Sequence, residues 1–200
     1  ARATVVIAAR EDGRIAGMDI AEAAFRMVDQ NLKITRLIRE GADVKKGDEV
    51  MQVEGRARSI LMAERVALNF MGHMSGVATL TLKMVRAVGN HKAKIAATRK
   101  TLPGLRAVQK YAVMVGGGIP HRYGLDDAVL IKDNHIAMAG AAAGNTAGGV
   151  RNAIRGAKAH IGHTVKIEVE VDTLEQLEEA LDEGVDIVML DNMTNAQMKK

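Results

Sequence analysis

Hydrophobic and polar residues follow two spacings in the first part of the chain. Residues 4–8 (Thr-Val-Val-Ile-Ala) predict a strand, and alternation across residues 34–38 predicts a second, half-buried one. Turn residues at Gly41 and at 46–48 precede a short strand expected at 50–53. Asp19 is predicted to cap a helix with the apolar face Ile20, Ala24, Met27 and Val28. This portion is expected to form a small α+β layer.

A long helical pattern follows from Ser59 onwards. Its apolar stripe consists of Ile60, Ala63, Ala67, Leu68 and Met71. Glycines at 72 and 76 predict a break or kink, after which helical spacing resumes as far as Val88. We therefore place the domain boundary within this helical region, with one domain over residues 1–72 and a second over 73–200.

From Lys94 the pattern changes to short apolar runs separated by helical segments. The runs lie at 95–97, 128–131, 165–171 and 187–190, and the predicted helices at 105–113, 150–161 and 174–181. Thr173 and Gln176 have the spacing of a capping box, which Thr194 and Gln197 repeat. Repeated βα units imply a parallel sheet or barrel. A barrel would need more strands than these, so the sequence is expected to be cut short at its C-terminus.

A stretch rich in alanine and glycine, residues 137–149, separates a predicted strand from a predicted helix. Small residues give it little apolar surface with which to order. We interpret it as a disordered spacer in preference to a mobile lid.

Composition narrows the possible classes of protein. The sequence is 48% hydrophobic and 26% charged, which is typical of a globular domain. It contains no apolar run long enough to span a bilayer and no secretory signal pattern. The absence of cysteine removes disulfides and thiolate metal sites, so we expect a cytoplasmic protein. The net charge of +4 is accompanied by only 2% aromatic residues, which argues against a nucleic-acid binder.

Charged residues recur where the predicted strands end. Arg99 and Lys100 follow one strand, Lys132 ends the next, and Asp191 follows the last. In parallel βα folds, binding groups gather beyond the carboxyl ends of the strands. Cations in these places predict a pocket for a small, highly anionic substrate.

Several of these features also have simpler interpretations. Arg65 lies off the apolar stripe of its helix, and its spacing alone favours an ordinary exposed arginine. Glu168, Glu170 and Asp172 share one face of a strand, which fits a solvated edge strand as well as an acidic site. The glycine triplet 116–118 suits close approach of the backbone to a ligand or a phosphate nest, but is not a dinucleotide fingerprint.

No serine–histidine–aspartate order, zinc-protease helix or EF-hand loop occurs in the sequence. Catalysis would therefore rest on positioning and charge stabilisation, as in phosphate and diphosphate chemistry.

Ordered motifs along nearly the whole chain resemble the quinolinate phosphoribosyltransferase family. They are Glu64-Arg65 with Leu68-Asn69, residues 75–79, Thr98-Arg99-Lys100-Thr101 with Pro103-Gly104-Leu105-Arg106, residues 110–113, the glycine triplet with His121-Arg122, residues 130–135, 168–171 and 190–192. The sequence departs from the family at Pro120, where asparagine is usual. The family's opening segment is not matched in this sequence. The two further glycine-rich strand ends that the family has after the position of residue 200 are not matched either.

This resemblance implies a small N-terminal α/β sandwich followed by an incomplete, TIM-like α/β barrel, acting as a homodimer. It implies phosphoribosyl transfer from phosphoribosyl pyrophosphate to quinolinate with decarboxylation, and Mg²⁺ bound with the diphosphate.

By position, the resemblance assigns the two pyridine carboxylates to Arg99, His121, Arg122 and Lys132. It also places Arg65 in the pocket of the partner subunit, which differs from the simpler interpretation of Arg65 as an ordinary exposed arginine. Lys100 would contact phosphate, and Glu170 and Asp191 would contact ribose hydroxyls or the metal. Two alternatives stay open: a related phosphoribosyltransferase with another acidic acceptor, and a non-catalytic fragment that binds anions or forms dimers.

Overall fold

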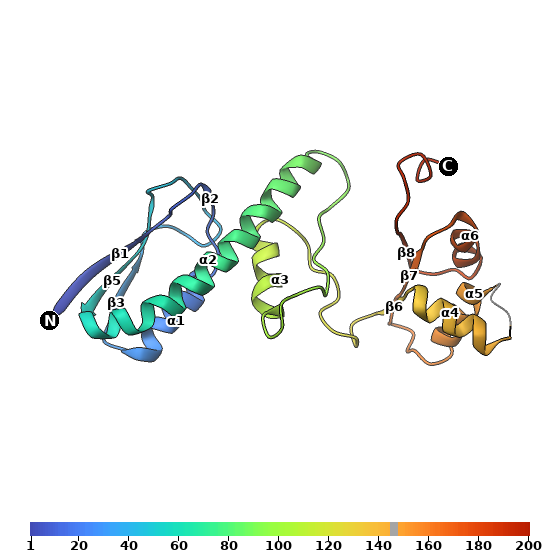
Figure 1. The fold of residues 1–200 in the computed structure, drawn as a ribbon, viewed down its shortest axis with the longest axis horizontal. Coiled ribbons are helices and arrows are strands. Elements are labelled where there is room, and N and C mark those ends of the chain that lie inside the picture. The colour runs from blue at the N-terminus through green and yellow to red at the C-terminus, as the bar shows by residue number, and fades with distance from the viewer. Residues whose placement is uncertain (145–147) are drawn as a thin grey trace. The chain divides into compact units, whose positions relative to one another are not determined.

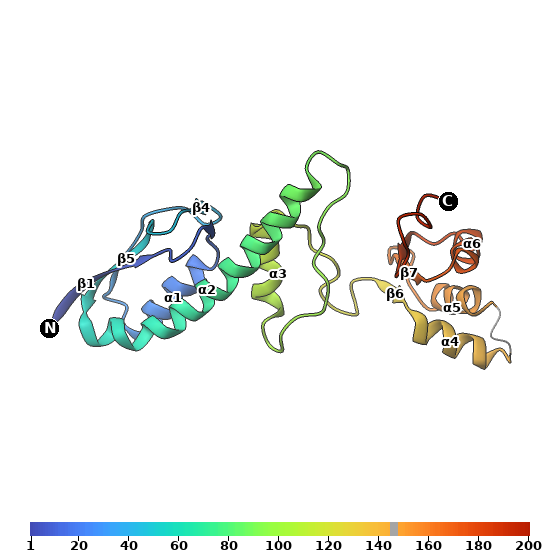
Figure 2. The ribbon, with the colours of Figure 1, turned by 45° about the horizontal axis from the view of Figure 1, so that its top comes forward.

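The computed structural model describes residues 1–144 and 148–200, which pack as two compact units, Ala1–His121 and Arg122–Lys200. We describe each unit by itself (Figures 1 and 2). Among the described residues, no helix has both the length and the apolar character needed to cross a membrane. The domain division expected between residues 72 and 73 stays a prediction.

The first unit begins with an antiparallel sheet in the order β1-β5-β3, formed by Arg2–Ala8, Glu49–Arg56 and Lys33–Arg36. Strands β2 (Gly13–Arg14) and β4 (Asp43–Val44) form a separate pair. Val5, Val53 and Ile34 lie in register across the larger sheet and contribute to its core face. Alternation of exposed and covered residues along β1 confirms the strand predicted from residue 4.

Helix α1, Met18–Val28, packs against α2, and the two helices complete the core of this layer. The predicted apolar face of α1 was only partly right: Ile20 and Ala24 pack against the core clusters, but Met27 is 88% exposed. The fully buried residues are Met18, Ala21 and Phe25. Asp19 lies inside the first turn and does not cap the helix. Instead Glu40, from a distant turn, accepts the N–H groups of Gly17 and Met18 at 2.7 and 3.0 Å.

Helix α2, Ala57–Val88, is one continuous helix of 32 residues. The predicted break at Gly72–Gly76 was wrong. Each glycine costs about 1 kcal/mol in a helix interior. Apolar side chains on both sides of the glycines are buried, and this burial outweighs that cost; they are Ile60, Ala63, Ala67, Met71, Met74, Ala78 and Leu82.

Helix α3, Arg106–Val115, packs on the second half of α2 through a small apolar cluster that contains Met74, Ala78 and Ala112. Residues 95–97, predicted as a strand, form only a single parallel bridge between Ala96 and Ile119. The connections on either side of α3 are therefore loops. Backbone hydrogen bonds join them, from Ala97 N–H to the Ile119 carbonyl at 2.9 Å and from Ile119 N–H to the Ile95 carbonyl at 2.8 Å.

The second unit is a parallel sheet in the order β6-β7-β8, formed by Val129–Ile131, Ile167–Val171 and Ile187–Leu190. Its helices are α4 (Asp133–Ala142), α5 (Gly149–Lys158) and α6 (Leu174–Asp182). The α/β class is confirmed, and the three described strands form an open sheet. Ile131, Ile167, Val169 and Val171 pack against α5 and α6 on one face.

The disordered-spacer interpretation of residues 137–149 was wrong for its first part. Residues up to Ala142 continue α4, and Gly149 begins α5, which packs against α4. Alanine favours helix strongly, so a low-complexity stretch rich in alanine can be helical when a neighbour covers it. Residues 145–147 of that stretch lie outside the described residues.

Candidate active site

Two of the predicted cations lie in the loop between residue 97 and α3. Arg99 is half-buried, and its Nε atom is buried without a hydrogen-bond partner among the described residues. Lys100 is exposed and lines a cavity of about 210 Å³ with Thr98, Thr101, Lys110 and others. Arg99 does not line this cavity, but the loop as a whole offers a guanidinium N–H without a partner among the described residues and a lysine at a cavity, groups that suit a carboxylate or phosphate.

The glycine triplet leads into His121, which is half-buried. A Cβ atom on Gly116 would lie 2.6 Å from the carbonyl oxygen of Ala78, and one on Gly118 would lie 2.6 Å from Val113 Cγ1. These two glycines are thus required by close packing on α2 and α3. The interpretation as close approach to a ligand does not account for them.

Arg122 begins the second unit. Its Nη1 donates to the carbonyl oxygen of Ala128 at 3.1 Å, whereas its buried Nε has no partner among the described residues. Arg99 and Arg122 are therefore alike in having a buried Nε–H with no hydrogen-bond partner among the described residues. Leaving such a donor unpaired costs about 1–3 kcal/mol, which a bound anion would offset.

Lys132 and Glu170 form an ion pair at the ends of adjacent strands. Ile131 pairs with Val169 in the parallel register, so the next residue of each strand reaches the same edge of the sheet. The Lys132 side chain is 39% exposed and the Glu170 side chain 15% exposed. His135 Nδ1 accepts the backbone N–H of Lys132 at 3.0 Å, which fixes the start of α4.

The edge-strand interpretation of the acidic face on β7 was wrong. Strand β7 is the central strand, and Glu168 is only 7% exposed. Because alternate residues of β7 pack into the apolar core, Glu168 and Glu170 face the other side of the sheet, with Lys132.

Asp191 follows β8 and is half-buried. Its backbone N–H donates to the carbonyl oxygen of Val171 at 3.0 Å, and its Oδ2 accepts from Asn192 Nδ2 at 2.8 Å. Among the described residues, no three His, Asp, Glu or Cys side chains gather closely enough to hold a metal by themselves.

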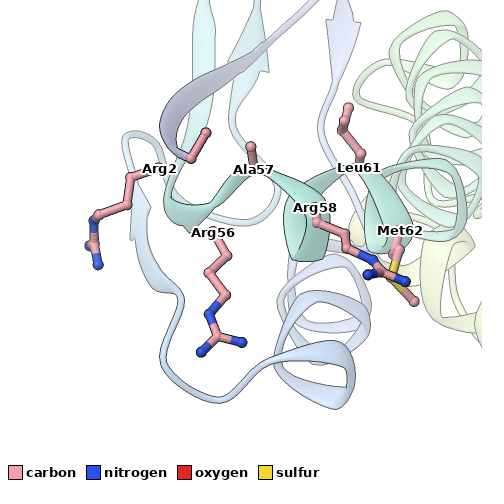
Figure 3. Close-up of a pocket in the computed structure, with 7 residues that line it drawn as sticks. Arg2, Arg56, Ala57, Arg58, Leu61 and Met62 are labelled. Atoms are coloured by element: carbon pink, nitrogen blue, oxygen red, sulfur yellow. The ribbon is translucent and has the colours of Figure 1, made fainter.

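Arg65 lies on the exposed face of α2 and away from the loops of the first unit that carry cations. Nearby, Arg58, Leu61 and Met62 project from the outer surface of the first turns of α2 (Figure 3). They line a hollow of about 800 Å³ together with Arg2 and Arg56. This hollow contains none of the predicted site residues, so its size does not identify it as the site.

The structure thus brings the predicted residues into two groups. Arg99, Lys100 and His121 lie on loops of the first unit, and Arg122, Lys132, Glu170 and Asp191 lie at the start and strand ends of the second. Gln109 and Lys110 contact the loops of the first group, and the sequence prediction missed both. The only signal for them was Lys110 within a motif of the family resemblance.

Comparison with known protein families matches both parts of the chain. Residues 1–75 match the N-terminal domain of quinolinate phosphoribosyl transferase, and residues 77–200 match its C-terminal domain.

Curated relatives are similar over most of the chain. A probable nicotinate-nucleotide pyrophosphorylase [carboxylating] of Methanocaldococcus jannaschii is 44% identical over 100% of this chain and 66% of that protein. The Mycobacterium leprae nicotinate-nucleotide pyrophosphorylase [carboxylating] is 46% identical over 92% of this chain and 62% of that protein. The chain therefore spans slightly less than two thirds of either relative.

Solved structures agree with these matches. NadC from Streptococcus pyogenes superposes with a TM-score of 0.90 at 42% identity, covering 98% of this chain and 67% of that one. The nicotinate-nucleotide pyrophosphorylase from Francisella tularensis gives a TM-score of 0.88 at 41% identity, covering 97% and 66%.

Proposed function

The chain belongs to the quinolinate phosphoribosyltransferase family, and on that premise we propose that it acts in phosphoribosyl transfer to quinolinate. The reaction consumes phosphoribosyl pyrophosphate and quinolinate and yields nicotinate mononucleotide, diphosphate and carbon dioxide. The observation that carries this proposal is that the Nε atoms of Arg99 and Arg122 are buried and have no hydrogen-bond partner in the part of the chain that the structure describes. Both arginines are in motifs of the resemblance, and both retain donors that a dicarboxylate would satisfy.

Substrate recognition in this proposal is electrostatic. Arg99, His121, Arg122 and Lys132 would bind the two carboxylates of quinolinate, because arginine can hold a carboxylate through paired hydrogen bonds. Lys100 would contact phosphate as a compact charge on a flexible stem. Its exposed position beside a cavity supports this role.

The carboxylates of Glu170 and Asp191 would act on the sugar. Displacement of diphosphate by the pyridine nitrogen builds positive charge at the anomeric carbon, which nearby carboxylates stabilise. They would also accept hydrogen bonds from the ribose hydroxyls. The contact between Glu170 and Lys132 supports a site in which the acid and the cation stand side by side.

Decarboxylation would follow on the same ring. The bond between the ring and the carboxylate beside the nitrogen breaks, the electron pair stays on the ring carbon, and that carbon then takes a proton. The cationic nitrogen formed by the transfer stabilises this electron pair. Fixed cations would hold the remaining carboxylate in place while carbon dioxide leaves.

Mg²⁺ is the metal that we propose for the diphosphate. Magnesium commonly binds through one or two carboxylates, water and substrate phosphates, without an all-protein cage. Glu170, near the end of β7, and Asp191, directly after β8, supply carboxylates of the kind that such a site uses. When bound, the ion would neutralise charge on the departing diphosphate.

We propose a homodimer in which Arg65 enters the partner's site. Leu61, Met62 and Val66 surround it on the exposed face of α2 and are 68%, 62% and 50% exposed. Such an apolar stripe around an arginine is typical of a surface that becomes buried on association. The absence of cysteine also fits a reducing compartment, and we propose the cytoplasm.

Two measurements test the proposed reaction. Chromatographic detection of nicotinate mononucleotide from the two substrates and Mg²⁺ tests turnover, and calorimetry with each substrate separately tests binding. Turnover with both substrates bound supports the enzyme. Binding of quinolinate without phosphoribosyl pyrophosphate would indicate an anion-binding fragment, and absence of saturable quinolinate binding would contradict the proposal.

Complementation tests the shared site. Arg65→Ala and Arg99→Ala variants, each inactive alone, should recover about one quarter of wild-type activity when mixed and allowed to exchange, because half the dimers then hold one intact site. No recovery, with exchange verified by mass, would place Arg65 in the site of its own chain.

A further inference from the structure

Helix α3 is a fixed support for the loops on either side of it. It is packed on α2 through Met74, Ala78 and Ala112. Tyr111 ties its outer side to the first layer: burial raises the pKa of this phenol, and the nearby carboxylate of Glu40, which also bonds it, raises the pKa further. A side chain that reaches from α3 to a loop can therefore set the position of that loop.

Gln109 of α3 holds the loop that carries Arg99 and Lys100. Its Oε1 accepts the backbone N–H of Leu102 at 2.9 Å. Its Nε2 lies 2.9 Å from Nε2 of His73 on α2, so one amide links that helix to the loop. Leu102 itself is 52% exposed, so the loop is fixed less by apolar packing than by hydrogen bonds, this one and that from Arg106 Nε to Thr101 Oγ1 at 3.2 Å.

Lys110, the next residue of α3, holds the second loop. It is only 4% exposed, and its Nζ donates to the carbonyl oxygen of His121 at 3.1 Å. Because the peptide unit is planar, fixing this carbonyl also fixes the amide nitrogen of Arg122. A buried ammonium carries a desolvation cost of several kcal/mol, so a lysine here is poorly explained by packing alone.

Both side chains border the same space. Gln109 and Lys110 line the cavity of about 210 Å³ that Lys100 and Thr98 also line. Two adjacent residues of one helix thus contact the two cation-bearing loops of the first unit around one cavity.

We propose that Gln109 and Lys110 are positioning residues, which hold the two loops in the geometry that binds substrate. This inference rests on the proposed function. The two residues have separable effects: Lys110 sets the peptide between His121 and Arg122, which face quinolinate, whereas Gln109 sets the loop of Arg99 and Lys100, which face both substrates.

Calorimetry with quinolinate and with phosphoribosyl pyrophosphate, each titrated separately, tests this division. Lys110→Met should weaken quinolinate binding about 30-fold and leave phosphoribosyl pyrophosphate binding within about two-fold, since a displacement near 1 Å can cost about 100-fold. Lys110→Arg keeps a buried donor and should recover most of the loss. Gln109→Leu should weaken both ligands about five- to ten-fold, as expected for one lost hydrogen bond.

Lys92→Met, at an exposed position, is the matched control for removal of a lysine, and circular dichroism monitors folding. Selective loss in Lys110→Met with recovery in Lys110→Arg supports the inference. Wild-type affinity in a folded Lys110→Met, or equal weakening of both ligands, overturns it. If Lys110→Met does not fold, the test uses Gln109→Leu and Lys110→Arg. Wild-type affinity for both ligands in Gln109→Leu then overturns the inference. Failure of the wild-type chain to bind quinolinate contradicts the proposed function instead.

Discussion

The two units hold their candidate site residues by different means. In the second unit, Lys132 and Glu170 occupy the ends of paired strands, and the parallel register alone brings them together. In the first unit, Arg99 and His121 lie on loops that contact Gln109 and Lys110 of α3. Strand-end residues therefore depend on the stability of the sheet, whereas loop residues depend on individual hydrogen bonds.

The largest expected effect is on the loop group. Arg99→Ala should weaken quinolinate binding at least about 100-fold, because it removes a charge-assisted carboxylate contact. The fold should persist, since the lost Nε donor has no partner within residues 1–144 and 148–200 that would be left unsatisfied. Calorimetry and thermal unfolding measure the two effects. Arg99→Lys keeps the charge but not the paired donors, so its quinolinate affinity should lie between those of Arg99→Ala and the wild type. Unchanged quinolinate affinity in Arg99→Ala would refute the assignment.

A smaller effect is expected at the strand ends. Lys132→Met should weaken quinolinate binding about ten-fold because a cation is lost. Glu170→Gln should weaken it by a similar factor because Lys132 loses the partner that positions it, and a double-mutant cycle should give a coupling of about 1 kcal/mol. The expected coupling energy is small because the Lys132 side chain is 39% exposed and water screens the ion pair. Strictly additive losses in the cycle would mean that the two residues act independently, against the paired arrangement described above.

Removing a helix cap in the second unit should destabilise that unit and leave the stability of the first unit unchanged. The Thr173 side chain accepts the N–H of Gln176 at 3.2 Å at the start of α6. Thr173→Ala should cost about 1 kcal/mol, and Thr173→Ser should cost little. Hydrogen exchange should speed up in β7 and α6 and stay unchanged in α1 and β5. Equal acceleration in both units would contradict separate stabilities.

The smallest effect concerns an ion pair outside the site. Hydrogen bonding from Arg36 lowers the pKa of Glu22 below 4.5, with Arg26 adding to the effect. Because the folded-state pKa is depressed, this contribution is present above pH 4.5 and is lost as the pH falls through the folded value. It should amount to less than about 1 kcal/mol. Glu22→Gln should flatten the fall in melting temperature between neutral pH and pH 3, and an unaltered pH profile would contradict this.

The sequence predicted regular elements best where one spacing dominated. A short, mainly apolar run identified β1, and a single capping threonine marked the start of α6, although Gln176 Oε1 accepts the N–H of Asp172 and not that of Thr173. Helical spacing likewise identified the buried face of the first half of α2. Each of these depends on residues close together in the chain.

Errors arose where distant groups decided the outcome. The start of α1 depends on Glu40, which lies beyond the next strand. The continuity of α2 through Gly72 depends on what covers its buried face. The central position of β7, which removes Glu168 from solvent, follows from strand order and not from alternation.

The residues of the candidate site show the same difference between local and distant determinants. The family motifs led to Arg99, Arg122 and Lys132, because residues that would touch ligand lie within recognisable stretches. Lys110 also lies in one of these motifs, but the motif gave no indication of the contact that Lys110 makes, and Gln109 lies outside the motifs. The roles of Gln109 and Lys110 follow only from the hydrogen bonds that join α3 to the loops of the first unit.

The most direct test of the central claim, that these cations receive a pyridine dicarboxylate, compares quinolinate with nicotinate by calorimetry on the wild-type chain. Nicotinate has one carboxylate and cannot engage the whole set. The account predicts saturable quinolinate binding at least about ten-fold tighter than that of nicotinate, since each charge-assisted contact contributes about 1.5–3 kcal/mol. Equal affinity for the two acids would contradict it.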